Sequence, residues 1–215
     1  DLTHYGDQTL VLLRSIAETG ASDLVRFANA GPALWENPAT RSYRDGATKA
    51  TVAHLRSGAA ASTSDEIAGA ARIAPLFLLK WENDDALVTA ARAQTALTHG
   101  GHATIEAAEF FARVVLAARR GDDIRSALVK TMKLDDRQGL LGDWFDNAVE
   151  SAASAESDAA ELHRHGLSCH TEDAFPGVCH LLLRHPQDPA TGLLANACAG
   201  GGSAARGAIL GLLSG

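Results

Sequence analysis

Residues 104–119 have the sequence TIEAAEFFARVVLAAR, and residues 84–97 have the sequence DDALVTAARAQTAL. In both stretches apolar residues recur every three or four positions, a spacing that places them on one face of an α-helix. No stretch of the chain shows convincingly the alternation of apolar and polar residues that is typical of a half-buried strand. The two stretches therefore predict an all-α fold.

Helices are also expected in much of the remaining chain. The predicted ranges are 9–19, 22–30, 46–56, 67–79, 122–133, a part of 142–163, 172–183, 190–199 and 203–213. Glycine and proline mark several ends, with Gly20 closing the first helix and Gly31-Pro32 the second. Apolar residues make up 46% of the chain and aromatic residues only 5%, so the core has to be built from small and straight side chains. Such material favours closely packed helices, and we expect an irregular multi-helix bundle.

Length and charge limit what the protein can be. At 215 residues the chain fits a single domain, 1–215. A net charge of −7 without a basic stripe argues against a nucleic-acid partner. No apolar run is long enough to cross a membrane, and the three cysteines show no disulfide framework. We therefore expect a cytoplasmic protein with reduced thiols. The opening Asp1-Leu2-Thr3, without an initiating Met, suggests that an N-terminal segment is missing.

Three consecutive glycines, Gly200, Gly201 and Gly202, precede Ser203 and the last predicted helix. Backbone N–H groups at such a helix start are not covered by side chains and favour an anion, so this segment is a candidate phosphate cradle with Ser203 as N-cap. No carboxylate follows Gly200 that could hold a cation. A structural alternative is that the glycines are ordinary loop residues that let helices pack closely.

Three other segments carry polar residues that suggest a ligand site. Residues 4–9 (HYGDQT) stand at a helix start. Either Asp7 and Thr9 satisfy N–H groups of the helix, or Asp7 and the amide oxygen of Gln8 face a cation or a ribose hydroxyl. Residues 62–76 contain hydroxyl side chains, a turn of small residues and Arg72. These residues either bind a pyrophosphate, or the hydroxyl side chains cap the next helix and Arg72 lies at its surface. In residues 95–102 a helix ends at His99. The imidazole of His99 either contacts a ligand or interacts favourably with the negative end of the helix dipole.

Cysteine and serine chemistry finds less support. Cys169-His170 and Cys179-His180 suggest a zinc site, but their spacing is not that of paired C-x-x-C ligands. We find no Ser-His-Asp arrangement, no dinucleotide-binding glycine motif and no P-loop in the sequence.

The order of these segments resembles the ADP-ribosylglycohydrolase family, most closely its crystallin-J-like branch. The resemblance rests on residues 5–9, 71–75 (ARIAP), 96–99 (ALTH), 174–177 (AFPG) and 200–203, and it extends over essentially all of the chain. It implies an all-α fold and hydrolysis of the glycosidic bond between ADP-ribose and an acceptor, with two Mg²⁺ ions. The partner it implies is an ADP-ribose-type small molecule or an ADP-ribosylated acceptor.

The resemblance also implies that the metal site is degenerate. The family's front box usually reads Thr-Asp-Asp-Thr, whereas residues 6–9 are Gly-Asp-Gln-Thr; its rear box loses both carboxylates in residues 200–205 (GGGSAA). Mg²⁺ needs several oxygen ligands, so the dinuclear site is expected to be weak or absent. Asp7 remains as the candidate catalytic residue and metal ligand. The candidate substrate-binding residues are Gln8, Thr9, Ser64, Gly69, Arg72, His99, Gly200, Gly201, Gly202 and Ser203. Two functions follow: binding or slow hydrolysis of an ADP-ribosyl N- or O-glycosidic linkage, or an inactive structural or binding protein of the same fold.

Overall fold

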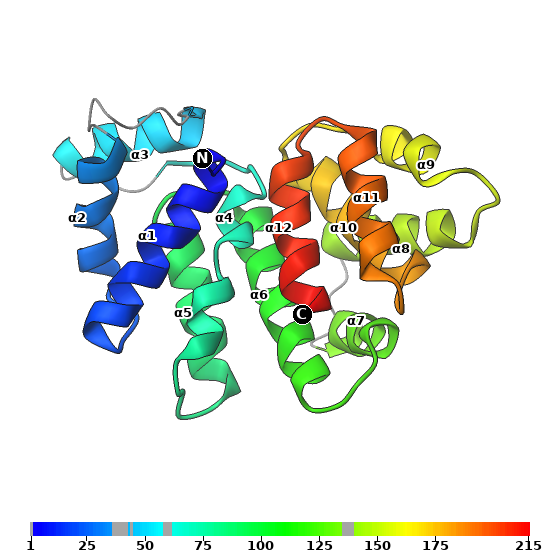
Figure 1. Cartoon of the computed structure of the whole chain (residues 1–215), viewed down its shortest axis with the longest axis horizontal. Coiled ribbons are helices and arrows are strands. Elements are labelled where there is room, and N and C mark those ends of the chain that lie inside the picture. The colour runs from blue at the N-terminus through cyan, green and yellow to red at the C-terminus, as the bar shows by residue number, and fades with distance from the viewer. Residues whose placement is uncertain (1, 36–42, 44, 58–61, 135–139) are drawn as a thin grey trace. The chain divides into compact units, whose positions relative to one another are not determined.

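A computed structural model of the chain describes residues 2–35, 43, 45–57, 62–134 and 140–215. These residues form twelve α-helices and one 3₁₀ helix, with no β-strand among them, which confirms the all-α prediction (Figure 1). The chain divides into two compact units, Asp1–Ala108 and Glu109–Gly215, and the boundary falls within α6 (His102–Arg119). In the described part of the chain, no helix is both long enough and apolar enough to cross a bilayer.

The first unit is built from short helices around α1. Its elements are α1 (His4–Thr19), α2 (Leu24–Trp35), α3 (Gly46–Ser57), α4 (Ala68–Ala71), the 3₁₀ helix η1 (Ala74–Leu78), α5 (Asp84–Ala96) and the start of α6. Helix α1 packs on α2 and η1, and α5 packs on α4 and η1. This packing brings the starts and ends of several helices to one place, where the polar residues described below are buried.

Helix α1 begins five residues earlier than predicted. The hydroxyl of Thr3 accepts a bond from the N–H of Gly6 and caps the helix, so residues 4–9 lie within it. The predicted end at Gly20 is confirmed: this residue has a left-handed backbone (φ 69°), and its N–H donates to the carbonyl of Ile16.

Two other predicted boundaries are wrong. Helix α2 continues through Gly31-Pro32 to Trp35. The single helix expected over residues 67–79 is divided into α4 and η1, and Arg72 ends α4. This break has a local cause, because Pro75 lacks an N–H and fits the first turn of a new helix better than the middle of a long one.

The second unit is organised around one largely buried helix. Its elements are the rest of α6, α7 (Ile124–Lys133), α8 (Leu140–Ala153), α9 (Asp158–His165), α10 (Thr171–Arg184), α11 (Pro189–Ala199) and α12 (Ser203–Ser214). Helix α10 contacts α7, α8, α9, α11 and α12. Eleven of its fourteen residues are buried, which is expected of a helix enclosed on all sides.

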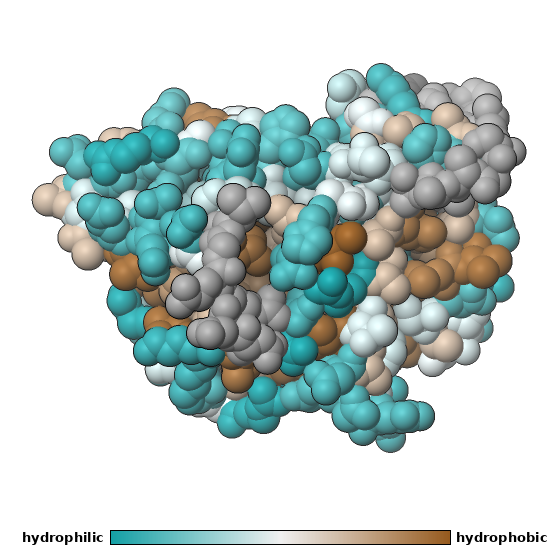
Figure 2. Space-filling model, turned by 180° about the vertical axis from the view of Figure 1, so that it is seen from behind, coloured by the Kyte–Doolittle hydropathy of each residue, from teal (hydrophilic) through white to brown (hydrophobic). Residues whose placement is uncertain are grey.

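Four phenylalanines form the aromatic part of the second unit's core. Phe175 of α10 lies with its ring centroid 5.2 Å from Phe110 and 5.4 Å from Phe111, both on α6. Phe145 of α8 contacts Phe110 at 6.0 Å. Aromatic pairs at these separations add to the burial of apolar area. On the face shown in Figure 2, hydrophobic residues lie among hydrophilic ones, which is usual for a protein surface.

Candidate functional site

The front box places one polar side chain in the interior of the first unit. Gln8 is 2% exposed, and both ends of its amide are occupied. Its Nε2 donates to Thr48 Oγ1 at 3.0 Å, and its Oε1 accepts a bond from Arg72 Nη1 at 2.9 Å. Asp7, the preceding residue, is half-buried in the first turn of α1. Thr9 turns its hydroxyl to the carbonyl of Tyr5, within the same helix.

Arg72 is the centre of this buried network. It is 1% exposed, and its Nη2 donates to the carbonyl of Gln94 at 2.6 Å and to the hydroxyl of Thr98. Its guanidinium lies over the ring of Phe27, 5.4 Å from the centroid. Burial lowers the pKa of Arg72 to about 9, and the charge of Asp45 opposes this shift. Arg72 therefore stays charged at neutral pH and ties α1, α4 and α5 together.

His99 is buried beside Arg72 and is neutral. Burial and the charge of Arg72 lower its pKa to about 3, against the opposing charges of Asp45 and Asp65. Its Nδ1 lies 2.8 Å from Thr98 Oγ1. Gly69 makes room for the imidazole, because a Cβ at Gly69 would lie 2.7 Å from the Cβ of His99. Gly69 is therefore a packing requirement of this site.

The loop that contains Ser64 is held in place by the glycines after His99. Gly100 N–H donates to the carbonyl of Ser62 at 2.7 Å, and Gly101 N–H donates to the carbonyl of Ser64 at 3.0 Å. The Ser64 hydroxyl accepts a bond from the N–H of Glu66. The loop is thus bound to the end of α5 by backbone hydrogen bonds, and Ser64 lies close in the fold to His99.

The glycine box, residues 200–203, belongs to the second unit. More of its backbone N–H groups make hydrogen bonds within the protein than its sequence suggests. Gly200 and Gly201 have left-handed backbones (φ 77° and 61°). The N–H of Gly200 donates to Ala197 O at 3.3 Å, and that of Gly202 donates to Leu167 O at 2.8 Å. The predicted N-cap, Ser203, is instead the first residue of α12, and Gly202 takes the cap position without a side-chain bond.

A second buried arginine, Arg206, fixes this turn from inside. Its Nε donates to Asn196 Oδ1 at 2.9 Å, and its Nη2 donates to the carbonyl of Gly200 at 2.7 Å. Asn196 Nδ2 donates in turn to the carbonyl of Ser203. Sequence reasoning missed this arginine, although its position one turn into a helix that follows a glycine turn was a usable signal.

The structure thus brings some predicted site residues together. Gln8 and Arg72 are bonded to each other, and His99 joins them through Thr98. The four residues of the glycine box form a separate group in the second unit. The catalytic role of Asp7 stays a prediction.

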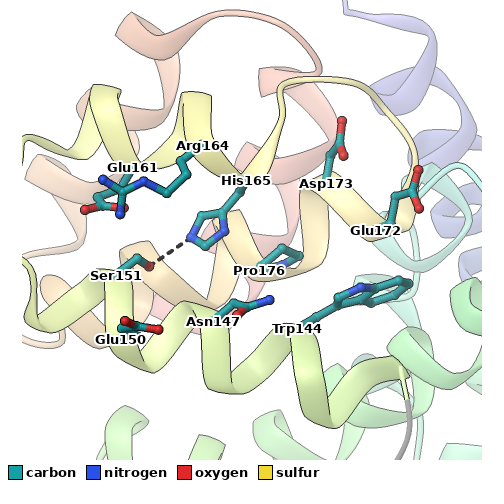
Figure 3. A pocket seen from close by; sticks show the side chains of 10 residues that line it. All are labelled: Trp144, Asn147, Glu150, Ser151, Glu161, Arg164, His165, Glu172, Asp173 and Pro176. Atoms are coloured by element: carbon teal, nitrogen blue, oxygen red, sulfur yellow. Dashed lines mark hydrogen bonds and ion pairs between the residues drawn. The ribbon is translucent and has the colours of Figure 1, made fainter.

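The second unit also contains a pocket of about 470 Å³ that the sequence did not predict (Figure 3). Four carboxylates and one guanidinium contribute to its lining, together with Trp144 and His165. The acidic residues are Glu150, Glu161, Glu172 and Asp173, and the basic one is Arg164. This excess of negative charge favours a cationic group and disfavours a pyrophosphate.

In the wall of this pocket, Ser151 takes part in a chain of hydrogen bonds. Its Oγ lies 2.9 Å from His165 Nε2 and 2.9 Å from His180 Nδ1. His180 Nε2 contacts Asp158 Oδ1 at 3.0 Å, and His185 Nε2 contacts the other carboxylate oxygen at 2.8 Å. The structure therefore contains a Ser-His-Asp chain that the sequence analysis did not find. Its three members come from α8, α10 and α9, and no local spacing signals such an arrangement.

This chain makes the stability of the protein dependent on pH. Burial lowers the pKa of His165 and of His180 from 6.5. Burial alone would raise the pKa of Asp158, but hydrogen bonds from His185 and His180 hold it below its usual value. The unfolded chain consequently binds protons more readily than the folded one. Stability is complete above pH 6.5, falls as pH drops toward the lowered histidine pKa values, and falls further when Asp158 is protonated.

We expect the free energy of unfolding, measured with urea, to be lower at about pH 5.5 than at about pH 7.5. The difference should be smaller for His180→Gln, because glutamine cannot bind the extra proton. His102→Gln is the matched control, because the side chain of His102 is 89% exposed. The same pH dependence in wild type and His180→Gln would contradict the assignment to His180.

These features define an all-α protein with a buried polar centre in one unit and an arginine-braced glycine turn in the other. The sequence profile of the ADP-ribosylglycohydrolase family matches residues 1–215, and the chain belongs to this family. No curated protein matches it. The family acts on ADP-ribosylated substrates, and an ADP-ribose-type partner fits this membership.

Proposed function

We propose that this protein binds an ADP-ribose-type ligand and has lost, or retains only weakly, the two-magnesium hydrolysis of an ADP-ribosyl N- or O-glycosidic linkage. The observation that carries the proposal is the amide of Gln8. It stands where the family usually has its second front-box carboxylate, and its oxygen already accepts a bond from the buried guanidinium of Arg72. A cation at that oxygen would have to displace the guanidinium and stand beside its positive charge.

The rear box supports the same conclusion. Family members usually carry an aspartate where this chain has Gly202, and a Cβ at Gly202 would lie 2.9 Å from the carbonyl oxygen of Ser168. The backbone at Ser168 is therefore too close to the turn for a side chain at residue 202. Asp7 is then the one carboxylate of the two boxes, and two Mg²⁺ ions need several carboxylates between them. The residues present do not fit a dinuclear magnesium centre.

The ligand class is supported by family membership and by the parts of the boxes that remain. Asp7 is half-buried at the start of α1 and is the candidate for orienting or deprotonating a water in any residual hydrolysis. The alternative function is that of an inactive structural protein. The hydrogen bonds of Gln8 and Arg72 favour this alternative, because they hold the helices of the first unit together and leave these side chains fewer polar atoms for a ligand.

Isothermal titration with ADP-ribose, with and without Mg²⁺, separates these two functions. We expect binding with the same dissociation constant in both conditions and weaker binding of ADP, which lacks the terminal ribose. A parallel assay would follow ADP-ribose release from peptides with N- and O-glycosidic linkages. Absence of binding in both conditions would favour the structural role. Magnesium-dependent release that Asp7→Asn abolishes would contradict the loss of the metal centre.

A further inference from the structure

Three side chains outside the family's two boxes converge in the interior of the first unit. Asp45, Glu66 and His99 each offer one donor atom, and the three donors lie within 4.8 Å of one another. Asp45 precedes α3, Glu66 precedes α4, and His99 follows α5. Two carboxylates and an imidazole are a donor set that proteins use for divalent transition metals.

The orientation of Asp45 leaves one oxygen for this cluster. Its Oδ1 accepts the N–H of Thr48 at 2.6 Å, which fixes the carboxylate at the start of α3. Its Oδ2 is buried and makes no hydrogen bond. The Nε2 of His4 lies 3.1 Å from this oxygen, is itself buried, and also makes no hydrogen bond. A second imidazole nitrogen is therefore next to the cluster.

The imidazole of His99, like the carboxylate of Asp45, has one atom fixed by a contact and one atom left for a metal. It is 0% exposed, and its Nε2 has no hydrogen-bond partner. Its Nδ1 contacts Thr98 Oγ1, whose other neighbour is the donating guanidinium of Arg72. With Nδ1 protonated and donating to Thr98, the Nε2 lone pair is left for a metal. Histidine ligands in metal sites are commonly oriented by such a bond from their second nitrogen.

The charges of the cluster favour a cation between the donors. Two carboxylates this close repel each other in a buried site unless a proton or a cation lies between them. The charge of Arg72 acts on Asp45 and on His99 from nearby, but its Nη atoms donate to Gln8, Gln94 and Thr98 and not to the carboxylates. Mg²⁺ fits poorly, since it prefers an all-oxygen octahedral shell, whereas Zn²⁺ accepts mixed nitrogen and oxygen donors in a tetrahedron.

We propose that Asp45, Glu66 and His99 bind one divalent transition-metal ion, with Zn²⁺ the best match. This site uses neither Asp7 nor the glycine box and does not depend on the binding of ADP-ribose. The ion joins the starts of α3 and α4 to the end of α5. It therefore stabilises the first unit whether or not the protein binds a nucleotide.

The test is metal binding to the full-length chain after chelation. Titration with Co²⁺ is expected to give one ion per chain with the visible absorption of a tetrahedral site, and Zn²⁺ is expected to displace it while Mg²⁺ does not. Thermal unfolding should shift upward with Zn²⁺, because a ligand that binds the folded state stabilises it. Cys198, the exposed thiol, is replaced by serine in every sample, and a cobalt–thiolate charge-transfer band must be absent.

Asp45→Asn and Glu66→Gln retain the shape of each side chain while weakening the donor. We expect each to lower Co²⁺ affinity by more than about 100-fold, beyond what loss of a supporting residue typically causes. Asp65→Asn, an exposed neighbour, is the matched control and should bind as wild type does. Absence of stoichiometric Co²⁺ binding, or equal binding by the two carboxylate variants and wild type, would overturn the proposal. If either variant fails to fold, His99→Gln replaces it under the same criterion.

Discussion

Replacing Gly201 with alanine is expected to lower the free energy of unfolding by about 3 kcal/mol, through backbone strain and overpacking together. Gly201 has a φ of 61°, a conformation that alanine adopts only with strain. A Cβ there would also lie 2.2 Å from the carbonyl oxygen of Leu167. That same oxygen accepts the N–H of Gly202, so the two segments cannot separate without losing this hydrogen bond.

Gly211→Ala is the control for this prediction. Gly211 lies inside α12, and a Cβ there would meet no atom within 4 Å. The substitution should raise stability by about 0.5–1 kcal/mol, because alanine loses less backbone entropy than glycine in a helix. Urea titration of the full-length chain, followed by far-ultraviolet circular dichroism, measures both variants. A Gly201→Ala protein as stable as wild type would show that the turn is not packed against Leu167.

The expected effect at Gly201 also explains why this segment could be recognised but not interpreted from sequence. Three glycines before a helix indicate exposed N–H groups, and that inference is correct for a turn that faces solvent or a ligand. In this structure the turn faces Leu167 and Ser168, which are more than thirty residues earlier in the chain. Their carbonyl oxygens take the space that the inference left for an anion.

The helices themselves were predictable wherever local signals agreed. Asp84–Ala96 and His102–Arg119 follow the predicted ranges closely, because amphipathic spacing and flanking turns indicate the same bounds. Prediction was wrong at two prolines whose effect on a helix was misjudged. Helix α2 continues through Gly31-Pro32, and Pro75 begins η1 and so divides the helix predicted over residues 67–79.

The polar sites were harder to predict than the helices. Gln8 and Arg72 are 64 residues apart, and His180 is 29 residues from Ser151. Each pair is built by packing of separate helices, which no motif of fixed spacing describes. His99 was predicted as a ligand contact, yet the two carboxylates beside it were not, because Asp45 and Glu66 have no distinguishing sequence context.

Replacing Arg72 with methionine is expected to cost about 3 kcal/mol of stability, since buried acceptors that lose a charged donor carry most of the penalty. Methionine fills a similar space and removes the desolvation cost of a buried charge, which by itself favours the folded state. It leaves Gln8 Oε1, the Gln94 carbonyl and the Thr98 hydroxyl without the donor that the guanidinium supplied.

Arg72→Lys tests the shape of the donor at constant charge. A single ammonium cannot reproduce a planar fork that reaches three acceptors, so we expect a loss of about 2 kcal/mol. Arg14→Met on the exposed side of α1 is the control and should change stability by less than about 0.5 kcal/mol. If lysine restores full stability, charge alone maintains the centre of the first unit. If methionine does so too, the network is dispensable, and Gln8 would be free to face a ligand.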